Sequence, residues 1–305
     1  MFVVYIKDLF RKPVNQVWSV TDMAMKLVLL FVAVFAGCNA LPLEDPDQDM
    51  SIFFEHVDPN ARIVGGTHAA EGSHPHMVSI TYGATLRNLV CGGSIVTRRT
   101  ILTAAHCIVP IINDYEDTLR SNAHATVGTN QWFSGGQMYS YQGYVIHPEY
   151  GRFSKNDIGM LYTTTDIVWN NVVRPIVINY DWIGEGMNCR VAGWGRIRNG
   201  GIIARNLREL NVQTVDGDHC IREIARVGAI HNMRNTKVDP NIEICTFHSH
   251  NHGVCNGDSG SALVRVDRGQ QIGIVSWGLP CALGAPDIFV RLSAFRSWIQ
   301  SNTVN

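Results

Sequence analysis

Residues 255–261 place a serine, Ser259, inside the run Cys-Asn-Gly-Asp-Ser-Gly-Ser. A serine hydroxyl is a weak nucleophile, and it becomes reactive when an adjacent base takes its proton. Upstream, His106 follows the run Leu-Thr-Ala-Ala, and Asp157 begins the otherwise apolar run Asp-Ile-Gly-Met-Leu. A histidine can act as general base and then as general acid, and a buried aspartate can orient its imidazole and stabilise the charged form. The three residues together predict nucleophilic catalysis with Ser259 as the nucleophile.

Each of these residues also has an ordinary structural explanation. Gly-Asp-Ser-Gly can form a tight turn, a histidine beside a cysteine is often a packed side chain, and an aspartate in an apolar run can be a buried, paired acid. The catalytic interpretation is favoured by the order His-Asp-Ser, by separations of about fifty and about one hundred residues, and by the motif Arg-Ile-Val-Gly-Gly at residues 62–66. With these features the chain resembles the trypsin/chymotrypsin family of serine endopeptidases, from about Arg62 to the C-terminus.

Short strands separated by Gly- and Pro-containing turns must position these residues. Helical spacing is evident only near the end, at residues 294–300. This pattern predicts an all-β protein, either barrels or a sandwich. The resemblance implies more specifically two six-stranded antiparallel β-barrels with a C-terminal helix, barrel 1 at about residues 63–175 and barrel 2 at about residues 176–305. The nucleophile would lie on the second barrel and its two partners on the first.

The N-terminal part of the chain is expected to be removed from the mature protein. Residues 25–40 have a short positive start, an apolar core and a small-residue end, which is the pattern of a signal peptide, with a signal anchor as the alternative. Residues 1–24 have mixed charge and no clear period, and we interpret them as a non-native or dispensable extension. Residues 41–62 are acidic and rich in turn formers, so they resemble an activation peptide. The protein is therefore expected to be secreted and extracellular.

The resemblance also implies how the chain would be activated. Cleavage after Arg62 would free the amino group of Ile63, which would pair with Asp258. A buried ammonium and a buried carboxylate each need a partner, so the pair would order the loop around the nucleophile. The backbone N–H groups of Gly257 and Ser259 in that loop would stabilise the developing oxyanion. The uncleaved chain would then be nearly inactive.

Eight cysteines behind a signal peptide indicate a disulfide framework in an oxidising compartment. Cys38 would leave with the signal peptide. The resemblance implies three pairs, namely Cys91–Cys107, Cys220–Cys245 and Cys255–Cys281. Cys189 is left over, because the position at which some family members have its partner is Arg265 here. It is either buried as a small apolar residue or free for an intermolecular bond, and we favour the buried thiol.

Substrate specificity is implied by a further set of positions. Family members that cut after Lys or Arg carry an Asp six residues before the nucleophile, where this chain has Gly253, followed by Val254. The run Ser276-Trp277-Gly278 would pair with the substrate backbone as an added strand, and its small last residue would leave the pocket mouth open. Asp287 stands where chymotrypsins usually have Gly. A Gly at the floor with this Asp resembles the collagenolytic, brachyurin-like members of arthropods, which accept bulky apolar and also basic residues. The alternative is that Asp287 bonds backbone amides and never meets substrate.

Composition limits the other partners. From Ile63 onward there are 20 Lys+Arg and 18 Asp+Glu, a net charge of about +2, which predicts neither nucleic acid nor an acidic surface as a partner. The sequence has no Cys-x-x-Cys pair, and we interpret the run His-Ser-His-Asn-His at residues 248–252 as a solvated loop, although imidazoles can bind zinc or copper. The loop at residues 128–136 lacks the carboxylates that calcium needs. We therefore expect no cofactor and no metal.

The sequence thus predicts a secreted serine endopeptidase, made as a zymogen, with chymotrypsin-like or broad specificity and a digestive role. Its expected partners are protein or peptide substrates, an activating trypsin-like protease and protein protease inhibitors. We expect a monomer that has no contact with a membrane after signal cleavage. Two alternatives stay open: a catalytically silent homologue that binds partners through the same surface, and a cascade protease of narrow specificity.

Overall fold

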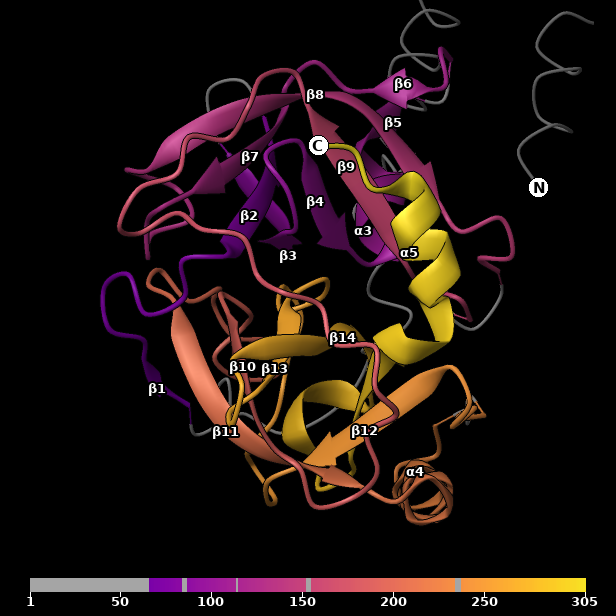
Figure 1. The fold of residues 1–305 in the computed structure, drawn as a ribbon. Helices are drawn as coiled ribbons and strands as arrows, with labels where there is room; N and C mark the ends of the chain where they lie inside the picture. Colours follow the sequence, from indigo (N-terminus) through magenta and orange to yellow (C-terminus); the bar gives the residue numbers. More distant parts are fainter. Residues whose placement is uncertain (1–65, 84–86, 114, 152–154, 234–236) are drawn as a thin grey trace, which may run out of the picture. The chain divides into compact units, whose positions relative to one another are not determined.

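Two sets of antiparallel strands close into barrels in the computed structural model, which describes residues 66–83, 87–113, 115–151, 155–233 and 237–305 (Figure 1). All of these residues belong to one compact unit of the chain, Ser51–Asn305. The expected signal peptide, the expected activation peptide and the residues around the expected cleavage point lie outside the described residues. The two six-stranded barrels and the C-terminal helix confirm the predicted fold class.

The first barrel closes in the order β2-β3-β4-β9-β8-β7. Its strands are β2 (Met77–Tyr82), β3 (Asn88–Ile95), β4 (Thr100–Thr103), β7 (Ala123–Val127), β8 (Gln137–Ile146) and β9 (Gly159–Thr163). Branched apolar side chains such as Ile80, Ile95 and Ile101 are fully buried inside it, as expected for strands that pack on a closed core. A small sheet of β5 (Ile112–Asn113) and β6 (Thr118–Leu119) follows the short helices α3 (Ala105–Ile108) and η3 (Val109–Ile111).

The second barrel closes in the order β11-β10-β13-β14-β15-β12, with β12 pairing back onto β11. Its strands are β10 (Asn188–Gly193), β11 (Arg208–Val215), β12 (Glu243–Phe247), β13 (Ala262–Arg265), β14 (Gln270–Trp277) and β15 (Asp287–Arg291), and η5 (Pro280–Ala282) and η6 (Leu292–Phe295) flank the last of them. The short strand β1 (Thr67–His68) falls in the range expected for barrel 1, yet it pairs with β11 of barrel 2. The apolar core of the first barrel continues into Ile274 and Val290 of the second, so the barrels share packed surface.

Helix α4 (Gly217–Ile230) has no counterpart among the elements that the sequence predicted. The Asp216 carboxylate caps it by accepting the backbone N–H of His219 at 2.9 Å. Cys220, Ile224 and Val227 are buried at spacings of four and three residues, which places them on one helix face. Within the described ranges, no helix is long and apolar enough to cross a membrane.

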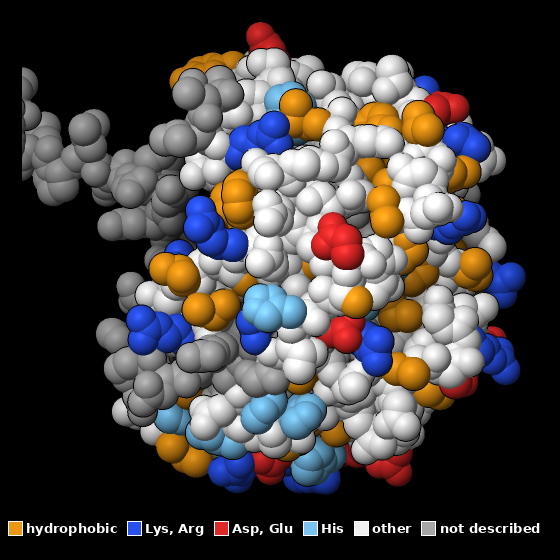
Figure 2. Space-filling model, turned by 90° about the vertical axis from the view of Figure 1, so that its left-hand side faces the viewer, with side chains coloured by type: hydrophobic (Ala, Val, Ile, Leu, Met, Phe, Trp, Pro, Cys, Tyr) orange, Lys and Arg blue, Asp and Glu red, His pale blue; other side chains and the backbone are white. Residues whose placement is uncertain are grey.

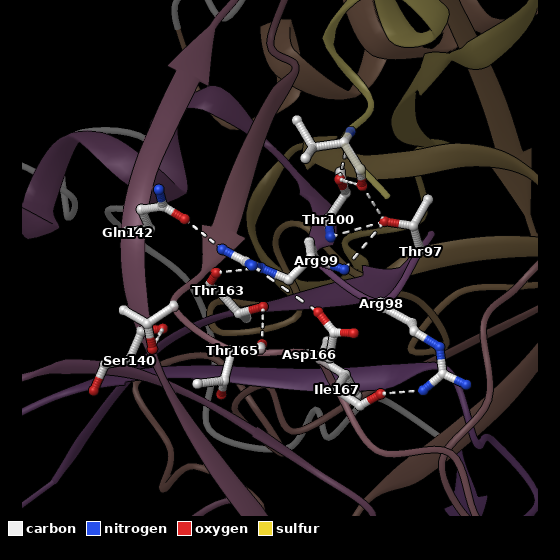
Figure 3. A network of polar contacts seen from close by, with 12 residues as sticks. Thr97, Arg98, Arg99, Thr100, Ser140, Gln142, Thr163, Thr165, Asp166 and Ile167 are labelled. Atoms are coloured by element: carbon white, nitrogen blue, oxygen red, sulfur yellow. Dashed lines mark hydrogen bonds and ion pairs between the residues drawn. The ribbon is translucent and has the colours of Figure 1, made fainter.

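The C-terminal segment returns from the second barrel to the first. Helix α5 (Arg296–Asn302) runs beside the first barrel (Figure 1), where the Tyr162 hydroxyl donates to the Asn302 carbonyl at 2.7 Å. Beyond the helix, the Thr100 hydroxyl donates to the Val304 carbonyl at 2.6 Å, and the Val304 N–H donates to the same hydroxyl at 3.0 Å (Figure 3). The end of the chain is therefore hydrogen-bonded to a strand that begins more than two hundred residues earlier.

Charge is dispersed on the face drawn in Figure 2. Lys and Arg side chains are scattered there among acidic, apolar and histidine side chains, and the described residues of this face gather no basic patch. This distribution matches the near balance of charges in the sequence.

Candidate active site

His106 and Asp157 lie in direct contact. His106 sits in α3, which follows β4, and the Cys91–Cys107 disulfide fastens this helix to β3. Asp157 accepts the backbone N–H of His106 on Oδ1 at 2.9 Å and contacts the imidazole Nδ1 with Oδ2 at 2.7 Å. A carboxylate can only accept, so this contact assigns the proton to Nδ1 and leaves the Nε2 lone pair free. Burial disfavours the charged imidazole, but the charge and hydrogen bond of Asp157 outweigh it and raise the pKa of His106.

Asp157 receives a further hydrogen bond from the second barrel. Asp157 is 1% exposed, and the Ser276 hydroxyl donates to its Oδ2 at 2.6 Å. The carboxylate therefore has three donors, namely this hydroxyl and the backbone and ring N–H groups of His106. These three donors hold the carboxylate toward the imidazole in one fixed orientation.

Backbone hydrogen bonds hold the loop that carries Ser259. The N–H of Gly92 on β3 donates to the Ser259 carbonyl at 2.8 Å, which ties this loop of the second barrel to the first. The N–H of Gly260 donates to the Val275 carbonyl at 2.8 Å, which ties it to β14. Gly260 has φ +80°, and a Cβ atom there would lie 2.2 Å from the Thr103 hydroxyl oxygen, so only glycine fits at this approach of the two barrels.

The structure brings Ser259 to the His106 side of the barrel interface without a hydrogen bond between their side chains. Within the described residues, Ser259 Oγ has no hydrogen bond, and His106 Nε2 lies 3.7 Å from Cys107 Sγ. In enzymes without substrate such contacts are often long, and they tighten in the complex. The nucleophile and the base are therefore both present, but the hydrogen bond between Ser259 Oγ and His106 Nε2 is not formed.

Two backbone N–H groups near the nucleophile lack intramolecular acceptors. The N–H groups of Gly257 and Ser259 donate to no acceptor within the part of the chain that the structure describes. Gly257 has φ +97°, and a Cβ atom there would approach the Gly195 Cα to 3.2 Å, so the loop passes this backbone closely. Free donors at this position can serve an oxygen of a bound substrate.

Asp258 is a buried carboxylate without a cation among the described residues. It is fully buried and accepts the N–H groups of Gly195 at 2.7 Å and Cys255 at 3.0 Å. Burial raises the pKa of Asp258 to about 7, although the two backbone hydrogen bonds oppose that rise. Arg62 and Ile63, which were expected to generate its partner, lie outside the described residues.

Asp287 lies between the two glycines that were expected to line the specificity pocket. A Cβ atom at Gly253 would lie 2.7 Å from Asp287 Oδ2, and one at Gly278 would lie 3.5 Å from Oδ1. The carboxylate is 5% exposed and accepts the backbone N–H of Val254 at 3.0 Å. Burial raises the pKa of Asp287 to about 7. Asp287 thus bonds a backbone amide and also faces the two glycines expected in the pocket.

Of the run expected to bind substrate, Ser276 and Trp277 end β14 and Gly278 follows directly after the strand. Within the described residues, the backbone N–H and C=O of Gly278 have no hydrogen-bond partner, so an added strand could pair there. The Trp277 indole is buried, and its Nε1–H donates to Glu243 Oε1 at 2.8 Å. Glu243 also accepts the ammonium of Lys155 at 2.6 Å. The sequence analysis did not find these last two residues, because they lie far apart in the chain and belong to no motif.

Among the described residues three disulfides are present, and they are the three pairs that the resemblance implies: Cys91–Cys107, Cys220–Cys245 and Cys255–Cys281. Cys189 is buried and free, and it lies opposite Arg265 in the pairing of β10 with β13. Burial raises the pKa of the Cys189 thiol to about 12, so the group is an unreactive thiol at neutral pH.

Two groups of possible metal ligands are of little use for binding an ion. Among the described residues, one cluster has three potential ligand atoms within 4.8 Å of one another, and it consists of His106 with Cys91 and Cys107. The two cysteines form a disulfide, so neither offers a thiolate. In the loop at residues 248–252, His248 and His252 stack with ring centroids 4.5 Å apart, and the Nδ1 atoms of both rings already have the Ser249 hydroxyl as a hydrogen-bond partner, at 2.8 and 3.0 Å.

Comparison with known proteins gives a consistent result. A family model described as Trypsin matches residues 63–299. The chain is 34% identical over 244 residues to "Chymotrypsin-2" of Vespa crabro, which covers 79% of this chain and 99% of that protein. It is 32% identical to "Trypsin, alkaline C" of Manduca sexta, in a match that covers 79% of this chain and 91% of that protein. It is also 32% identical to "Serine protease SP24D" of Anopheles gambiae, in a match that covers 79% of this chain and 81% of that protein. The chain belongs to the trypsin/chymotrypsin family and is a serine endopeptidase.

Proposed function

We propose that this chain is the zymogen of a secreted digestive endopeptidase that cleaves after bulky apolar residues and also after Lys or Arg. The observation that carries this specificity is the place of Asp287, whose carboxylate faces the positions of both Gly253 and Gly278. Two glycines leave room for a large side chain, and a carboxylate between them can pair with a cationic one. The relatives include proteins named as a chymotrypsin and as a trypsin at similar identity, so overall likeness does not choose between these specificities.

The proposed reaction is acyl transfer to Ser259 and then to water. The His106 Nε2 takes the proton of the hydroxyl as Ser259 Oγ attacks the scissile carbonyl, and Asp157 stabilises the imidazolium that forms. The N–H groups of Gly257 and Ser259 hold the developing oxyanion. His106 then gives its proton to the leaving amine, and a water molecule, activated by the same base, releases the acyl group. Substrate must first close the gap between Ser259 and His106.

Activation by cleavage after Arg62 is supported by the state of Asp258. A fully buried carboxylate with only backbone donors has an incompletely compensated charge, and the ammonium of Ile63 would complete its environment. The neighbouring loop carries the free N–H groups of the proposed oxyanion hole, so the new ion pair would act on them directly. We propose residues 25–40 as the signal peptide and residues 41–62 as the activation peptide.

The test uses recombinant protein that begins at Leu41, is cut with trypsin and is repurified. After N-terminal sequencing has confirmed Ile63, the protein is assayed on peptides that differ only in the residue before the cut: Phe, Leu, Ala or Arg. Strong cleavage after Phe and Leu with measurable cleavage after Arg is the expected result, and Asp287→Gly should lower Arg cleavage selectively. Ser259→Ala is the control for contaminating trypsin.

Other outcomes would change the proposal. Cleavage after Phe and Leu alone would leave Asp287 with a structural role only. Equal loss of Phe and Arg cleavage in Asp287→Gly would contradict the proposed contact. A protein with Ile63 as its N-terminus that cuts none of the four peptides would favour a binding homologue or a protease of narrow specificity.

A further inference from the structure

One buried carboxylate connects the two barrels beside the proposed active site. Glu243, the first residue of β12, is 4% exposed. Its Oε1 accepts the indole N–H of Trp277 at 2.8 Å. Its Oε2 accepts the Lys155 ammonium at 2.6 Å and the backbone N–H of Asp239 at 2.6 Å. Both oxygens are therefore satisfied, and one of them has a charged partner.

The two side chains that Glu243 holds belong to different parts of the catalytic arrangement. Trp277 ends β14, and the free backbone edge of Gly278 follows it directly. Lys155 comes from the first barrel and stands two residues before Asp157, which orients His106. The Glu243 carboxylate thus contacts both the end of β14, which would pair with substrate, and the segment that carries Asp157. It fixes the position of one relative to the other.

Stability alone is a weak reason for such an arrangement. Removing an acid and an ammonium from water is costly, and well-packed apolar side chains of similar size are often as stable in their place. What apolar residues cannot supply is a directional link, because a hydrogen bond and an ion pair each constrain the angle and the distance of their partners. The arrangement suits a role in geometry.

We propose that Glu243 is a positioning residue for extended substrates, which holds Trp277 and Lys155 so that the β14 edge and the Asp157 segment are aligned across the barrel interface. This inference rests on the proposed function of the Ser276-Trp277-Gly278 run as the strand that pairs with substrate. Glu243 itself touches no reacting atom. Its effect should appear with substrates long enough to use the strand, and it should be small with substrates that occupy only the specificity site.

The experiment compares two substrates with the same Phe before the cut: an N-acetyl-Phe ester and a tetrapeptide anilide that ends in Phe. The variants are Glu243→Met, Glu243→Gln, Lys155→Met and the double variant of Glu243→Met with Lys155→Met. The matched control is Glu209→Gln. Glu209 is a partly buried acid whose Oε2 lies 2.6 Å from His74 Nε2, and it contacts none of the residues of the proposed site. All rates are normalised to the concentration of active sites, titrated with a covalent serine reagent.

In Glu243→Met, kcat/KM for the tetrapeptide is expected to fall about tenfold, chiefly through KM, while the value for the ester stays within about twofold. Glu243→Gln should lose less, because its amide oxygen can still accept the Trp277 indole. Lys155→Met should show a smaller loss with the same preference for the long substrate, and because this side chain is partly exposed it serves if Glu243→Met does not fold. The double variant should lose no more than Glu243→Met, because Glu243→Met already removes the contact between Glu243 and Lys155 that the second change would remove.

Equal losses on both substrates, no loss on the tetrapeptide, or an equal selective loss in Glu209→Gln would each overturn the proposal. An unmutated enzyme that cleaves the ester but uses the tetrapeptide no better would show that the strand does not bind substrate. That result would overturn the function on which the inference rests, and it is visible before any variant is made.

Discussion

The ionisation of Asp287 should make the specificity of the activated enzyme depend on pH. Burial raises the pKa of this carboxyl to about 7, the backbone N–H of Val254 opposes the rise, and the nearby charge of Asp258 adds to it. Below this pKa the group is neutral and suits an apolar side chain, whereas above it the group is charged and suits Arg. Pairing of Asp258 with an ammonium would remove part of the repulsion, so the midpoint is expected at or slightly below pH 7.

The size of the effect follows from that midpoint. With a pKa of about 7, roughly 10% of the carboxyl is ionised at pH 6 and roughly 90% at pH 8. The ratio of kcat/KM for an Arg substrate to kcat/KM for a Phe substrate should therefore rise at least about tenfold over this range, because kcat/KM reports the free enzyme and the charged form favours only the Arg substrate. The ionisation of His106 affects both substrates alike and cancels in the ratio.

The assay is a pair of pH profiles from pH 5.5 to 8.5 at constant ionic strength, on two peptides that differ only in Arg or Phe before the cut. Asp287→Asn is the matched variant, because it keeps the shape of the side chain and removes the ionisation. Its ratio should be low and independent of pH. A flat ratio in the unmutated enzyme, or the same rise in Asp287→Asn, would refute the reasoning.

Three further changes test other parts of the structure. Arg265→Cys, opposite Cys189, is expected to form a new disulfide that closes a loop of about 76 residues and to raise the free energy of unfolding by up to ~4 kcal/mol; an oxidised variant whose urea midpoint equals that of the unmutated protein would contradict this. Ser276→Ala removes a donor to Asp157, which leaves more negative charge facing the imidazole, so the acid limb of the kcat/KM profile should move up by about half a pH unit; a downward shift would count against this account. Deleting residues 303–305 removes the bonds to the first barrel and should lower the free energy of unfolding by about 1–3 kcal/mol, whereas an unchanged thermal midpoint would show that they contribute little.

The parts of the site that sequence could predict are those carried by order and local motifs. His106, Asp157 and Ser259 were found from residue type and spacing, and Asp287 was found by counting from a cysteine. A count from Ser259 placed Arg265 at the position where some family members have the partner of Cys189, and the strand register does put the two residues opposite each other. Such inferences are possible because the fold fixes these distances along the chain.

The remaining features depend on tertiary contacts that leave no local pattern. Lys155 and Glu243 are 88 residues apart, and each alone has the appearance of an ordinary charged residue. Helix α4 was missed because the exposed apolar residues Ile221 and Ile230 obscure the helical spacing of the buried Cys220, Ile224 and Val227. The separation of the Ser259 and His106 side chains could not be predicted either, because it depends on how the nucleophile loop is ordered.

The hydrogen bonds of the C-terminal tail also bear on the order of synthesis. A ribosome releases the strands of the first barrel early, and domains generally fold from the N-terminus as they emerge. Thr100 begins β4 and Val304 follows α5, so this connection can form only after all strands of the second barrel have been synthesised. The two barrels also meet without the tail, through their shared apolar core and the hydrogen bond from Gly92 to Ser259. A folding intermediate with both barrels formed and the tail undocked would keep those contacts and lack only the bonds of Thr100.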